Sequence, residues 1–382
     1  MYFSEFEQIP VEPLSTDDCA QKLSDFDRII SLFESRQNFV QGQEFYKPIT
    51  LLRLMREEVG DLDRFLRLFF SFVESKLLKK GFDFKNAFSR LDNSLFSPSA
   101  VALEESLTAL AEKLLRCFFM PIKALAGNTP RITSRTTSFY DQDEVMAISR
   151  RTSALRESCL IRDHHRCVVS RIFDIDVVRK HKHKDRIIDD NGNEVSRNDQ
   201  IDYLEIAHII PFSCLSLTNI RRSKPELPEL TRAAFQILKM FNPVAVQELK
   251  GSNIDRPINA LTLNLAIQKY FNNFQIAFTR VQGVERTYTI DYVRPRNFHV
   301  FRTRLPVTVT LDLAPDNDIE LPSPQLLDIH RAIARILYLS KVGEYIDNFL
   351  GNVSHNVEAR GLSPLDECVR FILAFASDTS TS

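Results

Sequence analysis

Apolar residues in the first third of the chain recur three and four positions apart, the spacing that places them on one face of an α-helix. This pattern runs from residue 14 to residue 126, and Ser15 and Pro48 precede two of its apolar runs as helix-starting residues. Pro121 lies inside the last run, so we expect it to kink or break that helix. Residues 1–130 therefore predict a helical region whose apolar side chains form a core.

Short β-branched and apolar runs replace this helical spacing in the middle of the chain. One run starts at Tyr203 and stops at Pro211, a second covers residues 261–263, and helical spacing returns from 264 to 271. A proline cannot donate a backbone hydrogen bond, so we expect Pro211 to end the first strand. The predicted centre of this region is two strands followed directly by a helix.

The last part of the chain predicts a strand after Pro306 and a helix that starts at Pro324 with Ser323 as its cap. His330 falls on the apolar face of that helix, so we expect it to pack in a core rather than react. Together the patterns predict an α+β protein in four parts. They are a helical N-terminal region (1–130), a linker (131–149), a mixed domain (150–304) and a C-terminal strand with helices (305–378).

Charge is distributed unevenly, although the formal net charge is only −1. Residues 150–304 carry a net charge of +9, and the rest of the chain carries −10. A basic segment between acidic ends is typical of a protein that binds a polyanion such as nucleic acid. The alternative is that part of this charge belongs to an ordinary solvated surface.

The most basic run extends from Arg179 to Arg186 and precedes an Asp190-Asn191-Gly192 turn signal, so residues 177–200 predict an inserted basic hairpin. The cations that we expect to contact nucleic acid lie in this run and in the connection after Pro211. They are Arg179, Lys180, Lys182, Lys184, Arg221 and Arg222.

The six cysteines are scattered without a close pair, which favours reduced thiols in an intracellular compartment, cytoplasmic or nuclear, over a disulfide framework or a zinc site. The first residues lack the basic and apolar segments of a secretory signal. The most apolar helical run, 65–78, is interrupted by Arg67, Glu74 and Lys76, so we expect no membrane span.

His208 ends the first predicted strand between Ala207 and Ile209. A strand end holds a side chain in place while it faces a cleft, and imidazole has an unperturbed pKa of about 6.5, which suits a general base. The alternative for a single histidine among apolar residues is a hydrogen-bonded core position.

Three blocks of sequence give His208 a context. The blocks RDHHRCVVS (162–170), AHIIPF (207–212) and NALTL (259–263) resemble, in this order, those of the HNH endonuclease domain in large fungal proteins. The resemblance covers residues 150 to about 300, and FFMPIKALAGNTP and LPSPQLLDIHRAIARIL beside it are also similar to that family. In the first block we expect a short strand from Cys167 to Val169. We expect Arg162 and Asp163 to form a structural corner, with a phosphate contact as the alternative.

The resemblance implies a fold, a metal and a reaction. The family folds this motif as a two-stranded hairpin and one helix (ββα-metal) around a single divalent metal, for which Mg²⁺ or Mn²⁺ is expected here. By resemblance, His208 activates a water against a phosphodiester of nucleic acid, with DNA favoured over RNA. Asn259 then holds the connecting loop or lies near the metal, and the implied metal ligands are His208, Gln268 and Asn272.

The sequence departs from the family at these ligands. The family's last histidine falls on Gln268, the acid four residues later falls on Asn272, and Ala207 stands where more distant relatives have an aspartate. Residues four apart share a helix face, and both carboxamides can bind Mg²⁺ through oxygen but lack a carboxylate charge. Two functions stay open: an endonuclease, or a catalytically impaired HNH-fold protein that serves as a nucleic-acid-binding or interaction module.

Overall fold

The structure is a computed structural model of the 382-residue chain. It describes residues 6, 9–10, 12–37, 46–89, 91, 95–126, 142–180, 187, 194–195, 200–211, 227–249, 251–294, 305–312 and 318–357. The chain divides into two compact units, each assembled from segments that are distant in the sequence. Unit 1 comprises residues 1–124, 223–246 and 335–382, and unit 2 comprises residues 125–222 and 247–334. The four-part division expected from the sequence stays a prediction.

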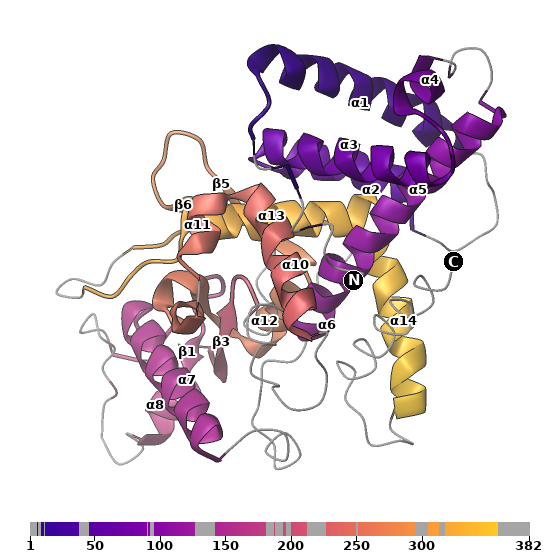
Figure 1. The fold of residues 1–382 in the computed structure, drawn as a ribbon. Helices are drawn as coiled ribbons and strands as arrows, with labels where there is room; N and C mark the ends of the chain where they lie inside the picture. Colours follow the sequence, from indigo (N-terminus) through magenta and orange to yellow (C-terminus); the bar gives the residue numbers. More distant parts are fainter. Residues whose placement is uncertain are drawn as a thin grey trace. The chain divides into compact units, whose positions relative to one another are not determined.

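Unit 1 is helical. Its elements are α1 (Thr16–Gln37), α2 (Pro48–Glu58), α3 (Leu62–Lys79), α4 (Phe84–Ser89), α5 (Pro98–Leu114), the π-helical turn η2 (Leu115–Phe119), α6 (Met120–Ala126), α10 (Leu227–Phe241), α11 (Pro243–Gln247) and α14 (Val342–Val357). The last residues of α6 (125 and 126) and of α11 (247) belong to unit 2. Figure 1 shows α1 running alongside α3, and both α2 and α3 pack on α5. The buried ring of Phe26 contacts Phe65 and Phe69 edge to face, with centroid distances of 5.6 and 4.7 Å. Apolar residues at helical spacing therefore form the core of this unit, as predicted.

The predicted helix starts are confirmed. The hydroxyl oxygen of Ser15 accepts the backbone N–H of Asp18 at 3.1 Å, and Pro48 is the first residue of α2. The expected break at Pro121 takes the form of η2, in which the N–H of Met120 donates to the carbonyl of Leu115. Pro121 supplies no N–H to the helix. The π-helical turn, which ends two residues before it, changes the pattern of backbone hydrogen bonds ahead of the proline.

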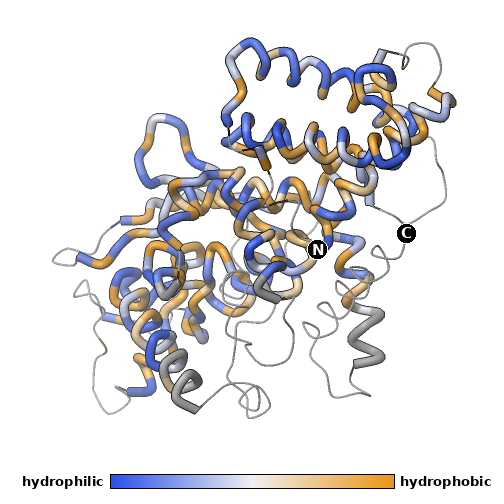
Figure 2. The backbone as a smooth tube through the Cα atoms, in the orientation of Figure 1, coloured by the Kyte–Doolittle hydropathy of each residue, from blue (hydrophilic) through white to orange (hydrophobic). Residues whose placement is uncertain are grey.

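Hydrophilic and apolar positions are interleaved along these helices, as Figure 2 shows. Among the described residues, no helix combines the length and the apolar character that a bilayer span requires.

Unit 2 mixes helices with three small sheets. Its elements are α7 (Gln142–Arg162), β1 (Phe173–Asp174), α8 (Ile175–Lys180), β2 (Ile201–Asp202), β3 (Leu204–His208), the 3₁₀ turns η5 (Gly251–Asp255) and η6 (Pro257–Asn259), β4 (Ala260–Asn264), α12 (Leu265–Asn272), β5 (Ile276–Arg280), β6 (Thr287–Tyr292), β7 (Val307–Thr310) and α13 (Pro324–Leu339), of which Arg335 onward belongs to unit 1. Strand β1 pairs with β2 in parallel, β3 pairs with β4 antiparallel, and β5, β6 and β7 form an antiparallel sheet in that order. The α+β class is thus confirmed.

The two strands and the helix predicted for the central motif are present. In the β3–β4 pair, His208 lies opposite Ala260, and α12 begins directly after β4. Figure 1 shows α7 beside β3, and its residues Leu155 and Cys159 form a buried cluster with Ile206 and Ala260. Because side chains alternate along a strand, Ile206 and His208 share the face of β3 that α7 covers. Helix α7 begins at Gln142, inside the predicted linker.

The predicted strand from Cys167 to Val169 is wrong. These residues form a turn, in which the N–H of Arg171 donates to the carbonyl of Cys167 at 2.9 Å and the N–H of Ser170 donates to its sulfur at 3.4 Å. The turn needs a left-handed backbone at Arg171 (φ 60°), which a non-glycine residue does not signal in a sequence. Cys167 itself is buried, as expected.

The predicted basic hairpin is wrong at its start, because residues 175–180 form helix α8. The carboxylate of Asp174 accepts the N–H of Asp176 at 2.9 Å and so starts the helix. Most of the remaining hairpin, including Lys182 and Lys184, lies outside the described residues; within them, the N–H of Val195 donates to the carbonyl of Ile187 at 2.7 Å.

The start of α13 and the packing of His330 are confirmed. The hydroxyl of Ser323 accepts the N–H of Leu326 at 3.3 Å, and Pro324 is the first helical residue. The buried ring of His330 stacks on Phe271 and Phe274, with centroid distances of 3.9 and 4.6 Å. Burial lowers the pKa of His330 from 6.5 to about 3, so the imidazole stays neutral in the folded protein.

Candidate active site

His208 ends β3 with only 10% of its side chain exposed. Its Nε2 lies 3.2 Å from Oδ1 of Asp255, a carboxylate in η5. A carboxylate that accepts the Nε2–H bond selects the imidazole tautomer whose lone pair is on Nδ1. The pair therefore orients the imidazole ring of this histidine.

Asp255 is itself held from the other side. Its Oδ2 lies 3.2 Å from Nε of Arg151 in α7, and its side chain is 7% exposed. Arg151, Asp255 and His208 thus form a continuous polar chain from helix to strand end. Burial shields the contact between Asp255 and His208 from water, so it is worth more than the same contact on a surface, whereas the side chain of Arg151 is 37% exposed.

The sequence prediction missed Asp255 and Arg151. Asp255 comes 47 residues after His208, and no periodic pattern connects them. A usable signal was present nonetheless, because Asp255 is the acid next to the NALTL block, four residues before Asn259.

Asn259 is fully buried and joins the two halves of the site. Its Oδ1 accepts the N–H of Ile210 at 2.9 Å, and its Nδ2 donates to the carbonyls of Ile210 and Ile254 at 3.0 and 3.1 Å. Its backbone carbonyl also accepts the N–H of Ile209 at 2.8 Å. The strand exit after His208 is therefore attached to the turn that carries Asp255. Of the two roles expected for Asn259, these contacts match the loop-holding one.

The expected corner of Arg162 and Asp163 is confirmed. The guanidinium donates to Asp163 at 2.8 and 2.7 Å, and to the carbonyls of Pro257 and Ala260 at 2.8 and 2.9 Å. Burial alone would lower the pKa of Arg162, but the adjacent Asp163 carboxylate more than offsets this and raises it. This permanent ion pair attaches the end of α7 to η6 and β4.

Cys159 packs against the β3–β4 hairpin, and its thiol is unreactive. Burial raises the pKa of its thiol from 9.0 to about 12. A thiol in this state is neither a nucleophile nor a ready metal ligand, so we assign it to packing.

Gln268 and Asn272 both lie on α12, and their carboxamides are not used by protein contacts. Gln268 is 8% exposed, and its Nε2 is buried without a hydrogen-bond partner. In the described part of the chain, no hydrogen bond is formed by the half-buried side chain of Asn272 either. Ala207 is buried and offers no ligand atom. Among the described residues no three His, Cys, Asp or Glu side chains gather as a metal site.

This donor set fits one kind of cation. Neutral amide oxygens suit a hard ion such as Mg²⁺, which keeps several waters and shares its coordination with substrate phosphates. They do not suit Zn²⁺, which takes its protein ligands from imidazole, thiolate and carboxylate. By their chemistry alone, the amide oxygens of Gln268 and Asn272 are donors of the kind that a hydrated Mg²⁺ or Mn²⁺ accepts.

Of the six cations expected to bind nucleic acid, the structure describes two. Arg179 and Lys180 are exposed at the end of α8, and the guanidinium of Arg179 lies 5.0 Å from the ring centroid of Tyr203. The other four lie outside the described residues: Lys182, Lys184, Arg221 and Arg222.

Comparison with known proteins adds one finding. Residues 167–279 match the family model described as HNH endonuclease. The matched segment contains His208, Asp255, Asn259 and Gln268. An HNH domain at this place suggests nuclease activity and implies binding of nucleic acid. No curated protein and no solved structure matches the chain.

Proposed function

We propose that the chain is an endonuclease that hydrolyses phosphodiester bonds of nucleic acid, with His208 as its general base. The observation that carries this proposal is the pairing of His208 with Asp255 at 3.2 Å, inside the segment that matches HNH endonucleases. A histidine that served only to fill the core would not need a buried carboxylate on its ring nitrogen, and His330 shows that alternative between two phenylalanine rings.

The chemistry follows from this pair. A water attacks the phosphorus, the new O–P bond forms as the bond to the leaving oxygen breaks, and the water's proton passes to Nδ1 of His208. The imidazole becomes an imidazolium, and the carboxylate of Asp255 offsets the positive charge through Nε2. Asn259 keeps the strand exit next to η5, so that His208 and Asp255 stay within hydrogen-bond distance.

HNH domains generally use a divalent metal, and we assign its protein contacts to the carboxamide oxygens of Gln268 and Asn272. His208, which the sequence also suggested as a ligand, is left out because Nε2 faces Asp255 and Nδ1 takes the water's proton. When bound, a metal ion stabilises the charge that develops on the phosphate and leaving oxygens. Gln268 and Asn272 would orient a hydrated ion against the substrate, because neutral ligands leave most of its coordination to water and phosphate.

A second candidate rests on the neutrality of that ligand set. Without a carboxylate on α12, the protein ligands supply no negative charge to hold a metal ion, and the substrate phosphates would have to supply it. In this candidate function the domain binds nucleic acid without cutting it. This is the catalytically impaired form, a binding or interaction module on the nuclease fold. The two candidates share the same partner and differ only in turnover.

We further propose DNA rather than RNA as the preferred substrate and an intracellular site of action. The exposed Arg179 and Lys180 support a nucleic-acid surface, which we extend to Lys182, Lys184, Arg221 and Arg222. The buried free thiols of Cys159 and Cys167 support a reducing compartment.

The test is nicking of supercoiled plasmid by the purified chain in Mg²⁺ or Mn²⁺, with the metal content measured on the same sample. The proposal expects nicked circles that a chelator prevents. Duplex binding with a steep salt dependence but no nicking would select the second candidate.

A further inference from the structure

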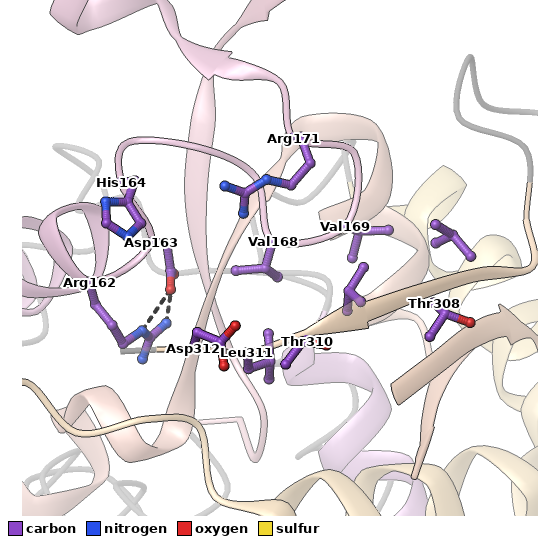
Figure 3. Close-up of a pocket in the computed structure, with 12 residues that line it drawn as sticks. Arg162, Asp163, His164, Val168, Val169, Arg171, Thr308, Thr310, Leu311 and Asp312 are labelled. Atoms are coloured by element: carbon purple, nitrogen blue, oxygen red, sulfur yellow. Dashed lines mark hydrogen bonds and ion pairs between the residues drawn. The ribbon is translucent and has the colours of Figure 1, made fainter. Parts of the chain in front are cut away.

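A cavity of about 370 Å³ lies in unit 2 along strand β7. Its walls are the end of α7 with the turn after it and the strand itself: Arg162, Asp163, His164, Val168, Val169, Arg171 and residues 307–312. Figure 3 shows Val168 and Val169 facing the strand that carries Thr308 and Thr310. We propose that this β7 cavity receives an extended peptide segment of a partner protein, which pairs with the outer edge of β7 as a further strand.

The outer edge of β7 offers backbone hydrogen bonds. Strand β7 ends the order β5-β6-β7, and the N–H of Leu311 donates to the carbonyl of Arg286 next to β6 at 2.9 Å. Bonding alternates along an antiparallel strand, so Val307 and Val309 also point their backbone groups at β6. Thr308 and Thr310 therefore point theirs away from β6, where no described strand pairs with them. Unpaired edges of this kind bind extended peptides.

The position of the cavity matches this edge. All six consecutive residues 307–312 line it. Successive side chains of a strand point to opposite faces, so a cavity bounded by every residue must run along the edge between the faces. The four residues of β7 span about 13 Å, the length of a four-residue extended peptide.

The opposite wall is formed by the turn after α7. Its residue His164 lies in the left-handed region (φ 56°). Beside it, the buried side chains of Val168 and Val169 make the wall apolar.

The lining favours a peptide over nucleic acid. Single-stranded nucleic acid is held by aromatic rings and a net positive groove, whereas no Phe, Tyr or Trp among the described residues lines this cavity. Its charges are mixed: Arg162 is bound by Asp163, and the exposed Arg171 is matched by the exposed Asp312. Valines from both walls suit small β-branched side chains at alternate positions of the partner.

The experiment uses the full chain and two variants at one position. A phage-displayed library of linear seven-residue peptides is panned on the wild type, and the best peptide is then titrated with a fluorescent label. Thr308→Pro removes an outward N–H without touching the bonds to β6, because a proline is tolerated at an edge. Thr308→Val keeps that N–H and serves as the matched control. Circular dichroism checks both folds.

The expected result is enrichment of peptides with alternating β-branched residues, bound by the wild type and Thr308→Val alike. Thr308→Pro should bind about tenfold more weakly. If Thr308→Pro does not fold, a peptide N-methylated at alternate residues tests the same bonds and should also bind about tenfold more weakly. The proposal would be overturned if no peptide is enriched or if Thr308→Pro binds the peptide as tightly as the wild type. It would also be overturned if the wild type captures a labelled single-stranded oligonucleotide and Thr308→Pro does not.

Discussion

Nε2 of His208 lies 3.2 Å from Oδ1 of Asp255, although 47 residues separate them in the sequence. The second oxygen of that carboxylate binds Arg151, so Asp255 is held from two sides. A histidine in this arrangement has an oriented ring and a carboxylate beside one ring nitrogen. These features support the proposed role of His208 as a general base.

Replacing Asp255 by asparagine should slow cleavage. Asp255→Asn keeps the shape of the side chain but removes the charge that supports the imidazolium, so we expect kcat to fall about ten- to hundredfold with KM unchanged. The measurement is the nicking rate at saturating plasmid. Asp291→Asn, at an exposed position of β6, removes the same charge and should be silent. Wild-type rates for Asp255→Asn would remove this carboxylate from the mechanism.

Asn259 should matter for stability as well as for activity. Asn259→Ala leaves the N–H and carbonyl of Ile210 and the carbonyl of Ile254 without their buried partner, which costs about 3 kcal/mol. Urea unfolding followed by circular dichroism measures this loss. The exposed Asn253→Ala should change the unfolding free energy by less than about 0.5 kcal/mol. An unchanged free energy of unfolding for Asn259→Ala would mean that these contacts do not hold the strand exit.

Restoring charged ligands on α12 should strengthen metal binding. The double variant Gln268→His with Asn272→Asp supplies an imidazole and a carboxylate four residues apart on one face, so we expect at least about tenfold tighter Mn²⁺ binding. Isothermal titration with Mn²⁺ measures it, and nicking should accelerate in parallel. Ala266→Asp adds a carboxylate at an exposed position of the same helix as the control. Equal affinities for all three proteins would place the metal elsewhere.

His330 should make unit 2 sensitive to acid. Its pKa is lowered by burial to about 3 in the folded protein, against 6.5 when unfolded, so below pH 6.5 the unfolded chain binds a proton that the folded chain does not. The neutral, packed imidazole thus contributes its full stability above pH 6.5. As the pH falls from 6.5 toward 3, the free energy of unfolding decreases by about 4 kcal/mol from this residue.

The check on this prediction is urea unfolding of the wild type and of His330→Phe at several pH values. The variant keeps a flat ring between Phe271 and Phe274 but cannot bind a proton. The gap in unfolding free energy between the two proteins should shift in favour of the variant as the pH falls from 6.5. A gap that does not change with pH would contradict the buried, neutral state of His330.

Several local features could be predicted from the sequence because their causes are local. Pro211 and the apolar run before it indicated β3, and Ser323 with Pro324 indicated the start of α13. The helix that carries Gln268 and Asn272 followed from apolar spacing. In each case the deciding residues lie within one turn or one strand of the feature that they specify.

The remaining features depend on contacts or backbone states without a local signal. Asp255 reaches His208 only through the fold, and hydrophobic spacing does not say which acid lies beside a given strand end. The turn at Cys167 needs a left-handed arginine, and α8 needs the Asp174 cap within a run that otherwise resembles a hairpin. The joining of residues 223–246 and 335–382 to the N-terminal helices likewise leaves no mark on periodicity.

The most direct test of the central claim is the nicking of supercoiled plasmid in Mg²⁺ by the wild type and by His208→Ala, at matched circular dichroism and matched duplex affinity. If His208 is the general base, the wild type nicks, and the variant loses about 10²- to 10⁴-fold in rate while still binding DNA. Nicking by His208→Ala at the wild-type rate would contradict the assignment.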